Sequence, residues 1–322
     1  MNVLVTGCAG FIGFHLTLKL LNKYNVFGVD NLNDYYDPTI KNDRLSKLKK
    51  EKNFRFYKLD ISNLNSLKKI IYKNKIKYIV HLAAQAGVRY SIDHPEKYVS
   101  SNLVGFFNVL EVARIFKIKH MIFASTSSVY GNNKKFPLKE DYDTDKPLSF
   151  YAATKKSNEV MAHSYSNIYK LPCTGLRFFT VYGPMGRPDM SLYKFSNAII
   201  KNKKIELYNK GNHYRDFTYV DDVVISISKL LTKPSKNQIP YDIFNIGSSK
   251  PYYLKKFLSL IEENLSKKAM VKFLKIQQGD VHKTHADVSK LKEKIKYSPK
   301  TDIRLGIKLF IDWYKAYYRL KK

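Results

Sequence analysis

The sequence predicts an α/β protein with a doubly wound parallel sheet and a smaller, mostly C-terminal α+β unit. Short apolar strands alternate with helical stretches through the first half of the chain, an order typical of parallel sheets flanked by helices. A glycine-rich turn joins the first strand to the first helix. Because ligands of such sheets bind beyond the carboxyl ends of the strands, the residues that follow each strand form the candidate site.

The length of 322 residues suits one large domain or two. We expect a nucleotide-binding domain over residues 1–178, to which residues of about 215–246 return, and a second domain over most of 179–322. No apolar run reaches the roughly 18 residues of a membrane span. The first strand follows Met1 almost directly, so we expect a cytoplasmic protein without a signal peptide. Cys8 and Cys173 lie in apolar segments, which predicts no disulfide framework.

The formal net charge of the chain is +30. Such a charge is compatible with a surface that binds nucleic acid or a membrane. The lysines are spread along the sequence, however, and no tail or block concentrates them. We therefore favour a solvated lysine-rich surface that also helps to attract an anionic small substrate, and we expect neither nucleic acid nor a membrane as a partner.

The first strand, Val3 to Val5, runs into a turn with Gly7, Gly10 and Gly13, and a helix follows through Leu21. Glycines at this spacing permit a tight turn, a close approach of the backbone to a pyrophosphate, and close packing of helix on strand. The helix N-terminus then offers N–H groups to the phosphates. The pattern predicts a Rossmann-type dinucleotide site, with an ordinary strand-to-helix turn as the alternative.

The next strand, residues 25–29, ends at Asp30. A carboxylate there accepts hydrogen bonds from both ribose hydroxyls and would repel a 2′-phosphate, which predicts NAD rather than NADP. A simple turn aspartate is the alternative.

The third strand, residues 54–59, is followed by Asp60, which is placed either to meet the adenine amino group or to cap the helix over residues 64–72. The fourth strand, residues 78–82, ends in two alanines that let a cofactor lie against the backbone. The residues expected to bind the cofactor are Gly7, Gly10, Phe11, Ile12, Gly13, Asp30, Asn31, Asn33, Asp60, Ile61, Leu82, Ala83, Ala84, Ser125, Tyr151 and Lys155.

After a long helix over residues 97–116 and a fifth strand over 120–124, hydroxyl side chains follow the strand end. One of them, Thr126, precedes Tyr151 and Lys155, which lie one helical turn apart on one face. An ammonium group and an oxidised nicotinamide beside the phenol would favour its ionised form. Tyr151 would then accept a proton from a sugar hydroxyl while a hydride leaves the same carbon. The Tyr-x-x-x-Lys spacing recurs elsewhere by chance, as at Tyr252, and only Tyr151 has this context.

The glycine turn, Asp30, Thr126, Tyr151 and Lys155 together resemble the extended short-chain dehydrogenase/reductase family, specifically its nucleotide-sugar epimerases. Dehydratases of that family carry an Asp-Glu pair directly after the catalytic threonine. Ser127 and Ser128 stand there in this chain, which argues against elimination of water.

Several further segments resemble UDP-glucuronate 4-epimerases: residues 30–36, 81–91, 179–190, 215–222 and 279–281. The resemblance implies that Arg215 binds the diphosphate and Asp280 the uridine ribose. It implies that Arg187 lies close to the sugar carboxylate, and that Arg89 faces the anionic substrate. The neutral donors implied for the carboxylate are Thr126, Ser127, Ser128 and Thr180.

Each of these roles has a structural alternative. In these alternatives Arg215 pairs with Asp216, Arg187 forms a structural salt bridge, and Arg89 lies in a solvated loop. Asp280 and the serines are then turn residues. The chain departs from the family pattern at Met185, usually tryptophan, at Gln277, an arginine in UDP-galactose epimerases, and at Thr126, commonly serine.

The activity implied is NAD-dependent 4-epimerisation of UDP-glucuronate to UDP-galacturonate through a transient 4-keto sugar. The alternatives are a 4-epimerase of a neutral UDP-hexose or UDP-N-acetylhexosamine, a UDP-glucuronate decarboxylase, and a non-catalytic NAD-binding regulator. No spaced histidine cluster suggests a metal site. The family resemblance implies a homodimer in which the helices over 97–116 and 149–169 pair with their symmetry mates. Helices over 253–265 and 305–318 are expected to supply the core of the second domain.

Overall fold

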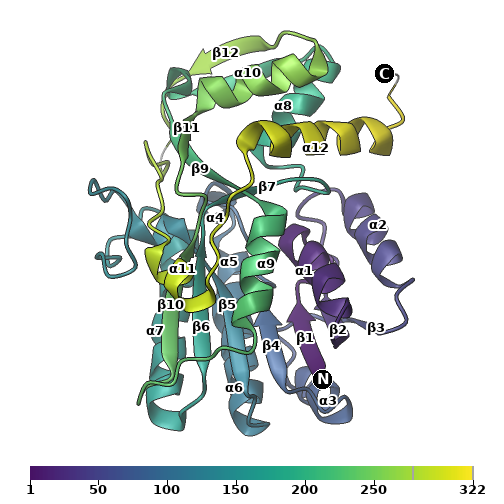
Figure 1. Cartoon of the computed structure of the whole chain (residues 1–322), viewed down its shortest axis with the longest axis vertical. Helices are drawn as coiled ribbons and strands as arrows, with labels where there is room; N and C mark the ends of the chain where they lie inside the picture. Colours follow the sequence, from purple (N-terminus) through teal and green to yellow (C-terminus); the bar gives the residue numbers. More distant parts are fainter. Residues whose placement is uncertain (278, 321–322) are drawn as a thin grey trace.

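The computed structural model describes residues 1–277 and 279–320, and it confirms the predicted doubly wound sheet (Figure 1). Seven parallel strands lie in the order β10-β6-β5-β4-β1-β2-β3, so the strand order reverses between β1 and β4. Their bounds are β1 Asn2–Thr6, β2 Asn25–Asp30, β3 Phe54–Lys58, β4 Tyr78–His81, β5 His120–Thr126, β6 Cys173–Phe178 and β10 Tyr241–Ile246.

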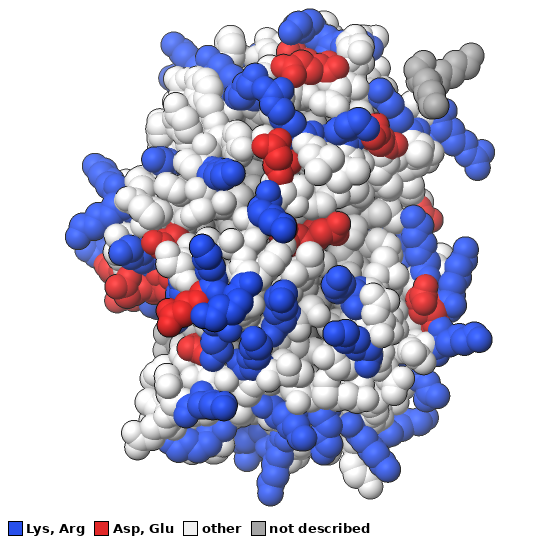
Figure 2. All heavy atoms as spheres, in the orientation of Figure 1, with Lys and Arg blue, Asp and Glu red and all other residues white. Residues whose placement is uncertain are grey.

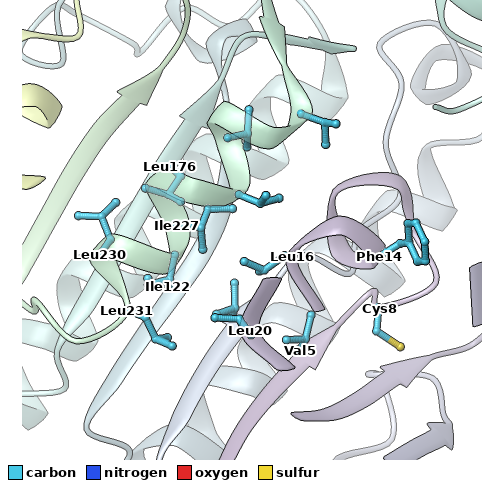
Figure 3. Packing of buried hydrophobic residues seen from close by; sticks show 14 of the residues in the cluster. Val5, Cys8, Phe14, Leu16, Leu20, Ile122, Leu176, Ile227, Leu230 and Leu231 are labelled. Carbon is cyan, nitrogen blue, oxygen red and sulfur yellow. The ribbon is translucent and has the colours of Figure 1, made fainter. Parts of the chain in front are cut away.

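Helices cover both faces of this sheet because its strands are apolar on both sides. Val3 and Val5 of β1 point to the face covered by α1 and α9, whereas Leu4 points to the face covered by α3 and α6. Figure 3 shows the first of these packed faces. The helices around the sheet are α1 Phe11–Leu21, α2 Pro38–Leu48, α3 Leu64–Lys73, α4 Tyr90–Asp93, α5 Pro95–Tyr98, α6 Gly105–Ile115, α7 Phe150–Tyr169, α9 Val220–Leu230 and α11 Ser289–Ile295, with the 3₁₀ turn η2 Ser127–Tyr130.

The long helix expected over residues 97–116 is not a regular α-helix. A π-helical segment, η1 Val99–Val104, separates α5 from α6. Asn102 lies in this segment, and its side-chain amide donates to the Gln85 carbonyl at 3.0 Å and accepts from the Gln85 N–H at 2.8 Å. This wider turn therefore holds the loop after β4, a feature that apolar spacing alone does not reveal.

A smaller unit lies above the carboxyl ends of the strands in Figure 1. A three-stranded sheet there has the order β11-β9-β7, and β12 pairs with β8. Its own core includes Phe217 and Phe257, whose rings stack at 3.9 Å, and Phe310. The elements are β7 Thr180–Tyr182, α8 Ser191–Ile200, β8 Lys204–Tyr208, η3 Asn209–Gly211, β9 Tyr214–Tyr219, β11 Pro251–Tyr253, α10 Leu254–Leu265, β12 Met270–Leu274 and α12 Ile303–Tyr317.

The chain passes between the two units more than once. β9 pairs with β7 and β11 in the small sheet, whereas α9 packs against α1 and β10 pairs with β6 in the large one. Within the segment of about 215–246, β9 thus belongs to the small sheet, while α9 and β10 pack with the large one.

Lysine and arginine side chains are spread over the face seen in Figure 2, with fewer acidic groups between them. Among residues 1–277 and 279–320, no helix combines the length and apolar character that a membrane crossing requires. In the same residues, no group of three or more histidine, cysteine, aspartate or glutamate side chains is arranged to hold a metal ion.

Two buried histidines predict a loss of stability in mild acid. Burial lowers the pKa of His81 to about 3 and that of His120 to about 4, from an ordinary value of 6.5. Below pH 6.5 these two histidines bind protons in the unfolded chain, whereas in the folded protein their rings stay neutral. The free energy of unfolding should therefore fall by about 1.4 kcal/mol per pH unit for each ring.

Urea titrations between pH 6.5 and 5 measure this slope. His120 bonds Leu231 O at 2.9 Å and Thr174 Oγ1 at 2.8 Å through its two ring nitrogens. The variant His120→Gln removes one titrating ring, so its slope should be smaller by about 1.4 kcal/mol per pH unit. A slope equal to that of the unmodified chain would contradict the assignment.

Candidate active site

A cleft of about 1300 Å³ lies at the carboxyl ends of the large sheet, between it and the smaller unit. Every residue that the sequence singled out for cofactor or substrate lines this one cleft. The structure therefore brings together strand ends, the glycine turn and loops of the second half that are more than 200 residues apart in the sequence.

The glycine turn fits its expected role at two positions. Gly7 has a φ of +73°, and a Cβ there would lie 2.7 Å from the backbone nitrogen of Ala83. A Cβ on Gly13 would lie only 2.0 Å from the Gly7 carbonyl oxygen. Side chains at these positions would push the turn, the helix and the end of β4 apart. The turn leads directly into the N-terminus of α1, whose first N–H groups are available to an anion.

Asp30 and Asp60 follow neighbouring strands at the cleft. The Asp30 carboxylate accepts from Ala9 N at 3.0 Å and from Leu32 N at 2.9 Å, and burial raises its pKa. Asp60 accepts from the Asn31 side chain at 2.8 Å. Asp60 does not cap α3, because Asn63 accepts from Ser66 N at 3.0 Å and is the cap. The pair Asn31–Asp60 is thus left at the cleft wall.

Tyr151 and Lys155 lie on the first turns of α7, which begins where Ser149 accepts a hydrogen bond from Ala152 N at 3.1 Å. Lys155 is buried, its Nζ donates to the Ala124 carbonyl at 3.0 Å, and burial lowers its pKa to about 8. Its ammonium is therefore fixed between α7 and the end of β5.

The structure changes the expected electrostatics of Tyr151. Burial raises the pKa of its phenol, and the effects that oppose burial are a hydrogen bond with Thr126 and the positive charge of Arg187. Lys155 alone does not make this phenol acidic, because its ammonium points at a backbone carbonyl. Thr126 and Arg187 thus favour the ionised form of Tyr151, whose ring also packs edge-on against that of Tyr98.

The hydroxyls at the end of β5 and directly after it point in different directions. Thr126 Oγ1 lies 3.2 Å from Ser128 Oγ and accepts from Ser128 N at 3.2 Å, so these two groups turn toward each other at the cleft. Ser125 instead donates to the buried Glu159 carboxylate at 2.6 Å. Its side chain supports the strand end from behind, and its backbone is the part left for a cofactor. Ser127 and Thr180 also line the cleft.

Arg187 forms the structural salt bridge that was the alternative to a substrate role. Its Nε donates to Asp189 Oδ1 at 3.0 Å, and its Nη2 pairs with the other carboxylate oxygen. Tyr35 donates to the same carboxylate at 3.3 Å. Arg187 lines the cleft all the same, and its Nη1 takes no part in these bonds. The sequence motif contained Asp189, but its spacing from Arg187 did not reveal the pairing.

Arg215 and Asp280, expected to bind different parts of the nucleotide, form an ion pair with each other at 2.8 Å. Asp216 is not the partner of Arg215, because its buried carboxylate accepts from the backbone amides of Ser248 and Ala286. Arg89 also approaches Asp280, at 3.9 Å. These charged groups therefore gather at one end of the cleft.

Sequence reasoning missed two other residues that line the cleft. His213 is buried with its Nε2 3.9 Å from Asp280, and Lys41 donates to the Asn33 carbonyl at 2.6 Å. Neither belongs to a recognisable motif. The departures from the family pattern have clear positions: Met185 is buried with a φ of +55°, and the side-chain oxygen of Gln277 is buried without a hydrogen-bond partner among the described residues.

Comparisons with known proteins agree over the whole length of the chain. A family model described as GDP-mannose 4,6 dehydratase matches residues 4–310. The chain is 48% identical over 334 residues to Protein CapI of Staphylococcus aureus, covering 99% of this chain and 100% of that protein. It is 42% identical over 321 residues to a UDP-glucuronate 4-epimerase of Thermodesulfobacterium geofontis, with coverages of 99% and 98%. The crystal structure of UDP-glucuronic acid 4-epimerase from Bacillus cereus, in complex with UDP-glucuronic acid and NAD, matches with a TM-score of 0.93 at 34% identity, covering 99% of this chain and 100% of that one.

Proposed function

The chain belongs to the family described as GDP-mannose 4,6 dehydratase, and from this premise we propose that it is a UDP-glucuronate 4-epimerase that uses NAD. The observation that supports this best is that Tyr151, Thr126 and Arg187 line a single cleft together with the glycine turn. A proton acceptor, a hydroxyl that bonds it and a cation for a carboxylate are what this reaction requires. The relatives named above support the same substrate and cofactor.

The residues present fit NAD. The cradle formed by Gly7 and Gly13 has no room for a Cβ and leaves N–H groups of α1 for the pyrophosphate. Asp30 is positioned for the ribose hydroxyls, and the Asn31–Asp60 pair lies where the adenine would be. NAD supplies a hydride acceptor and donor when bound. A buried carboxylate at Asp30 disfavours the additional phosphate of NADP.

The chain's own residues then move one proton. Tyr151 in its ionised form, which the charges of Arg187 and of a bound oxidised nicotinamide would favour, accepts the proton of the C4 hydroxyl as that carbon is oxidised. It returns the proton after the 4-keto sugar has presented its other face. Thr126 bonds the phenol and holds the same sugar oxygen. Lys155, fixed by the Ala124 carbonyl, holds the nicotinamide ribose. No net oxidation of the sugar results, and the product is UDP-galacturonate.

The 4-keto form of a uronate loses CO₂ easily unless its carboxylate stays charged and in the ring plane. Ser127, Ser128 and Thr180 offer neutral hydrogen bonds for this carboxylate, and Arg187 offers a charge. These groups favour epimerisation over decarboxylation. Since no acidic pair follows Thr126, elimination of water is also disfavoured.

The test is to incubate the purified protein with UDP-glucuronate and to identify the products by NMR. We expect an equilibrium mixture with UDP-galacturonate, without consumption of added NAD. A UDP-pentose as the main product would show a decarboxylase. Turnover of UDP-glucose but not of UDP-glucuronate would show the neutral-sugar epimerase, a candidate favoured by the neutralising pair Arg187–Asp189. Salt-sensitive binding of duplex DNA without any turnover would support a regulator.

Replacing Arg187 by glutamine should separate acidic from neutral substrates. A hydrogen bond to a charged group contributes about 1.5–3 kcal/mol, so kcat/KM for UDP-glucuronate should fall by about 10- to 100-fold. That for UDP-glucose should fall by a smaller factor, because a neutral sugar loses only the effect of Arg187 on Tyr151 and not a contact with a carboxylate. Arg304→Gln is the matched control, because Arg304 is exposed and pairs loosely with Glu263 at 3.7 Å. Equal losses on both substrates would contradict a role in carboxylate recognition.

The proposal includes a homodimer in the cytoplasm that supplies uronate units for polysaccharide synthesis. Its structural support is a set of exposed apolar side chains on two adjacent helices, Val104 and Phe107 near α6, and Val160 and Ile168 on α7. Light scattering after size-exclusion chromatography should give twice the chain mass of 37.5 kDa. Phe107→Glu should yield a monomer, and an unmodified chain that elutes as a monomer would contradict the dimer.

A further inference from the structure

Arg44, on α2, is the largest of the fully buried side chains and lies outside every motif discussed so far. Its guanidinium makes five hydrogen bonds, which equals the number of its N–H donors. The acceptors are the carbonyl oxygens of Ala9, Met185 and Gly186 and the hydroxyl of Tyr36. All four acceptor atoms are neutral, and the Met185 oxygen accepts twice, so these five bonds hold the buried cation through dipoles.

Burial of a charge is costly unless hydrogen bonds compensate it. The planar fork of arginine is the side chain that can meet several carbonyl oxygens in one plane, and a lysine cannot reproduce it. Arg44 uses this fork to join two segments of the cleft wall. Ala9 belongs to the glycine turn and accepts at 2.9 Å, while Met185 accepts at 2.6 Å and 3.2 Å from two different nitrogens.

The second of these segments needs such support. Met185 has a left-handed backbone with a φ of +55°, which is unfavourable for a residue with a side chain. The carbonyls on both sides of it are also held: His15 Nε2 bonds Pro184 O at 2.8 Å, and Arg44 reaches Gly186 O at 3.2 Å. Arg187 follows immediately, so its position in the cleft depends on the conformation of this turn.

We propose that Arg44 is a positioning residue that ties the glycine turn to the turn at residues 184–186, so that retention of NAD and recognition of the sugar carboxylate by Arg187 depend on one buried guanidinium. The part of this inference that concerns the carboxylate rests on the proposed function. The part that concerns the glycine turn does not.

The test uses full-length Arg44→Lys, which keeps the charge, and Arg44→Met, which keeps the approximate length. NAD content is measured from the cofactor released by denaturation, and calorimetry gives the Kd for UDP-glucuronate, UDP-glucose and UDP in protein saturated with NAD. We expect Arg44→Lys to bind UDP-glucuronate about ten-fold or more weakly, the loss of roughly one charged hydrogen bond. Its affinity for UDP and UDP-glucose should stay within about two-fold, and its NAD content after dialysis should fall. Arg304→Lys is the matched control for NAD content and affinities.

A purely structural role would lower the affinity for all three nucleotides together, and that outcome would overturn the proposal. The proposal would also be overturned if the variant kept both its NAD content and its preference for UDP-glucuronate. If Arg44→Met does not fold, the measurements on Arg44→Lys alone test the proposal. The double variant Arg44→Lys with Arg187→Gln should bind UDP-glucuronate no more weakly than Arg187→Gln alone. If the unmodified chain shows no preference for UDP-glucuronate, the proposed function fails, while the NAD measurement still tests Arg44.

Discussion

Tyr151→Phe is expected to lower kcat for epimerisation by about 10²- to 10⁴-fold, the usual contribution of a positioned acid–base group. The substitution removes only the phenolic oxygen, which lies at the cleft beside Thr126 and within the field of Arg187. The phenol of Tyr151 lies one helical turn from Lys155, whose buried Nζ is fixed by the Ala124 carbonyl. The measurement is single-turnover formation of UDP-galacturonate with NAD-saturated protein.

Two controls separate the loss of the phenolic oxygen from a loss of cofactor or substrate binding. The variant should retain its NAD content and its Kd for UDP-glucuronate to within about three-fold, because the ring remains in place and a buried isosteric change costs little. Tyr252→Phe alters another tyrosine that precedes a lysine by four residues, and it should leave the rate unchanged. A Tyr151→Phe enzyme that turns over at the normal rate would remove the basis of the mechanism.

Glu159→Ala is expected to reduce the free energy of unfolding by about 3–5 kcal/mol, the cost of breaking one partner out of a buried ion pair. Glu159 accepts from Arg177 at 2.9 Å and 2.8 Å and from the Ser125 hydroxyl at 2.6 Å, and both charged side chains are only 5% exposed. Alanine at this position leaves the Arg177 guanidinium buried without its counter-ion. Urea unfolding at pH 7 measures the loss.

The matched surface pair is Lys308–Asp312, whose side chains are 63% and 56% exposed. Asp312→Ala should cost no more than about 0.5 kcal/mol, because exposed helix pairs contribute little. If Glu159→Ala lowers the free energy of unfolding by no more than Asp312→Ala does, the Glu159–Arg177 pair does not hold the end of β5. Because Ser125 is bonded to the same carboxylate, the substitution should also lower the affinity for NAD in protein that remains folded.

The strands and their order along the chain were predictable from the sequence for a physical reason. Strands of a parallel sheet are buried on both faces, so each appears as a short apolar run, and the residue after each run must lie at the same edge of the sheet. Asp30, Ala83 and Thr126 were found in this way. The glycine spacing was equally readable, because the close contacts of Gly7 and Gly13 exclude any side chain.

The parts that escaped prediction depend on contacts between distant segments. Arg44 appears in the sequence as one more basic residue of a helix, and only its meeting with Met185, 141 residues away, reveals its burial. The pairing of Arg215 with Asp280 is similar, since the neighbouring Asp216 was the obvious local partner. The bond from Lys155 to the Ala124 carbonyl was not predictable either, because helical spacing places Lys155 on the same face as Tyr151 but does not fix where its ammonium points.

The return of β10 to the large sheet has a consequence for attempts to divide the protein. β10 covers the outer edge of β6, and α9 covers the apolar side of α1, yet both come from beyond residue 219. A fragment that stops at residue 178 would expose the unpaired backbone edge of β6 and the apolar side chains of Leu16 and Leu20. Expressed alone, such a half-molecule should self-associate into insoluble material, whereas insertions in a surface loop would be tolerated.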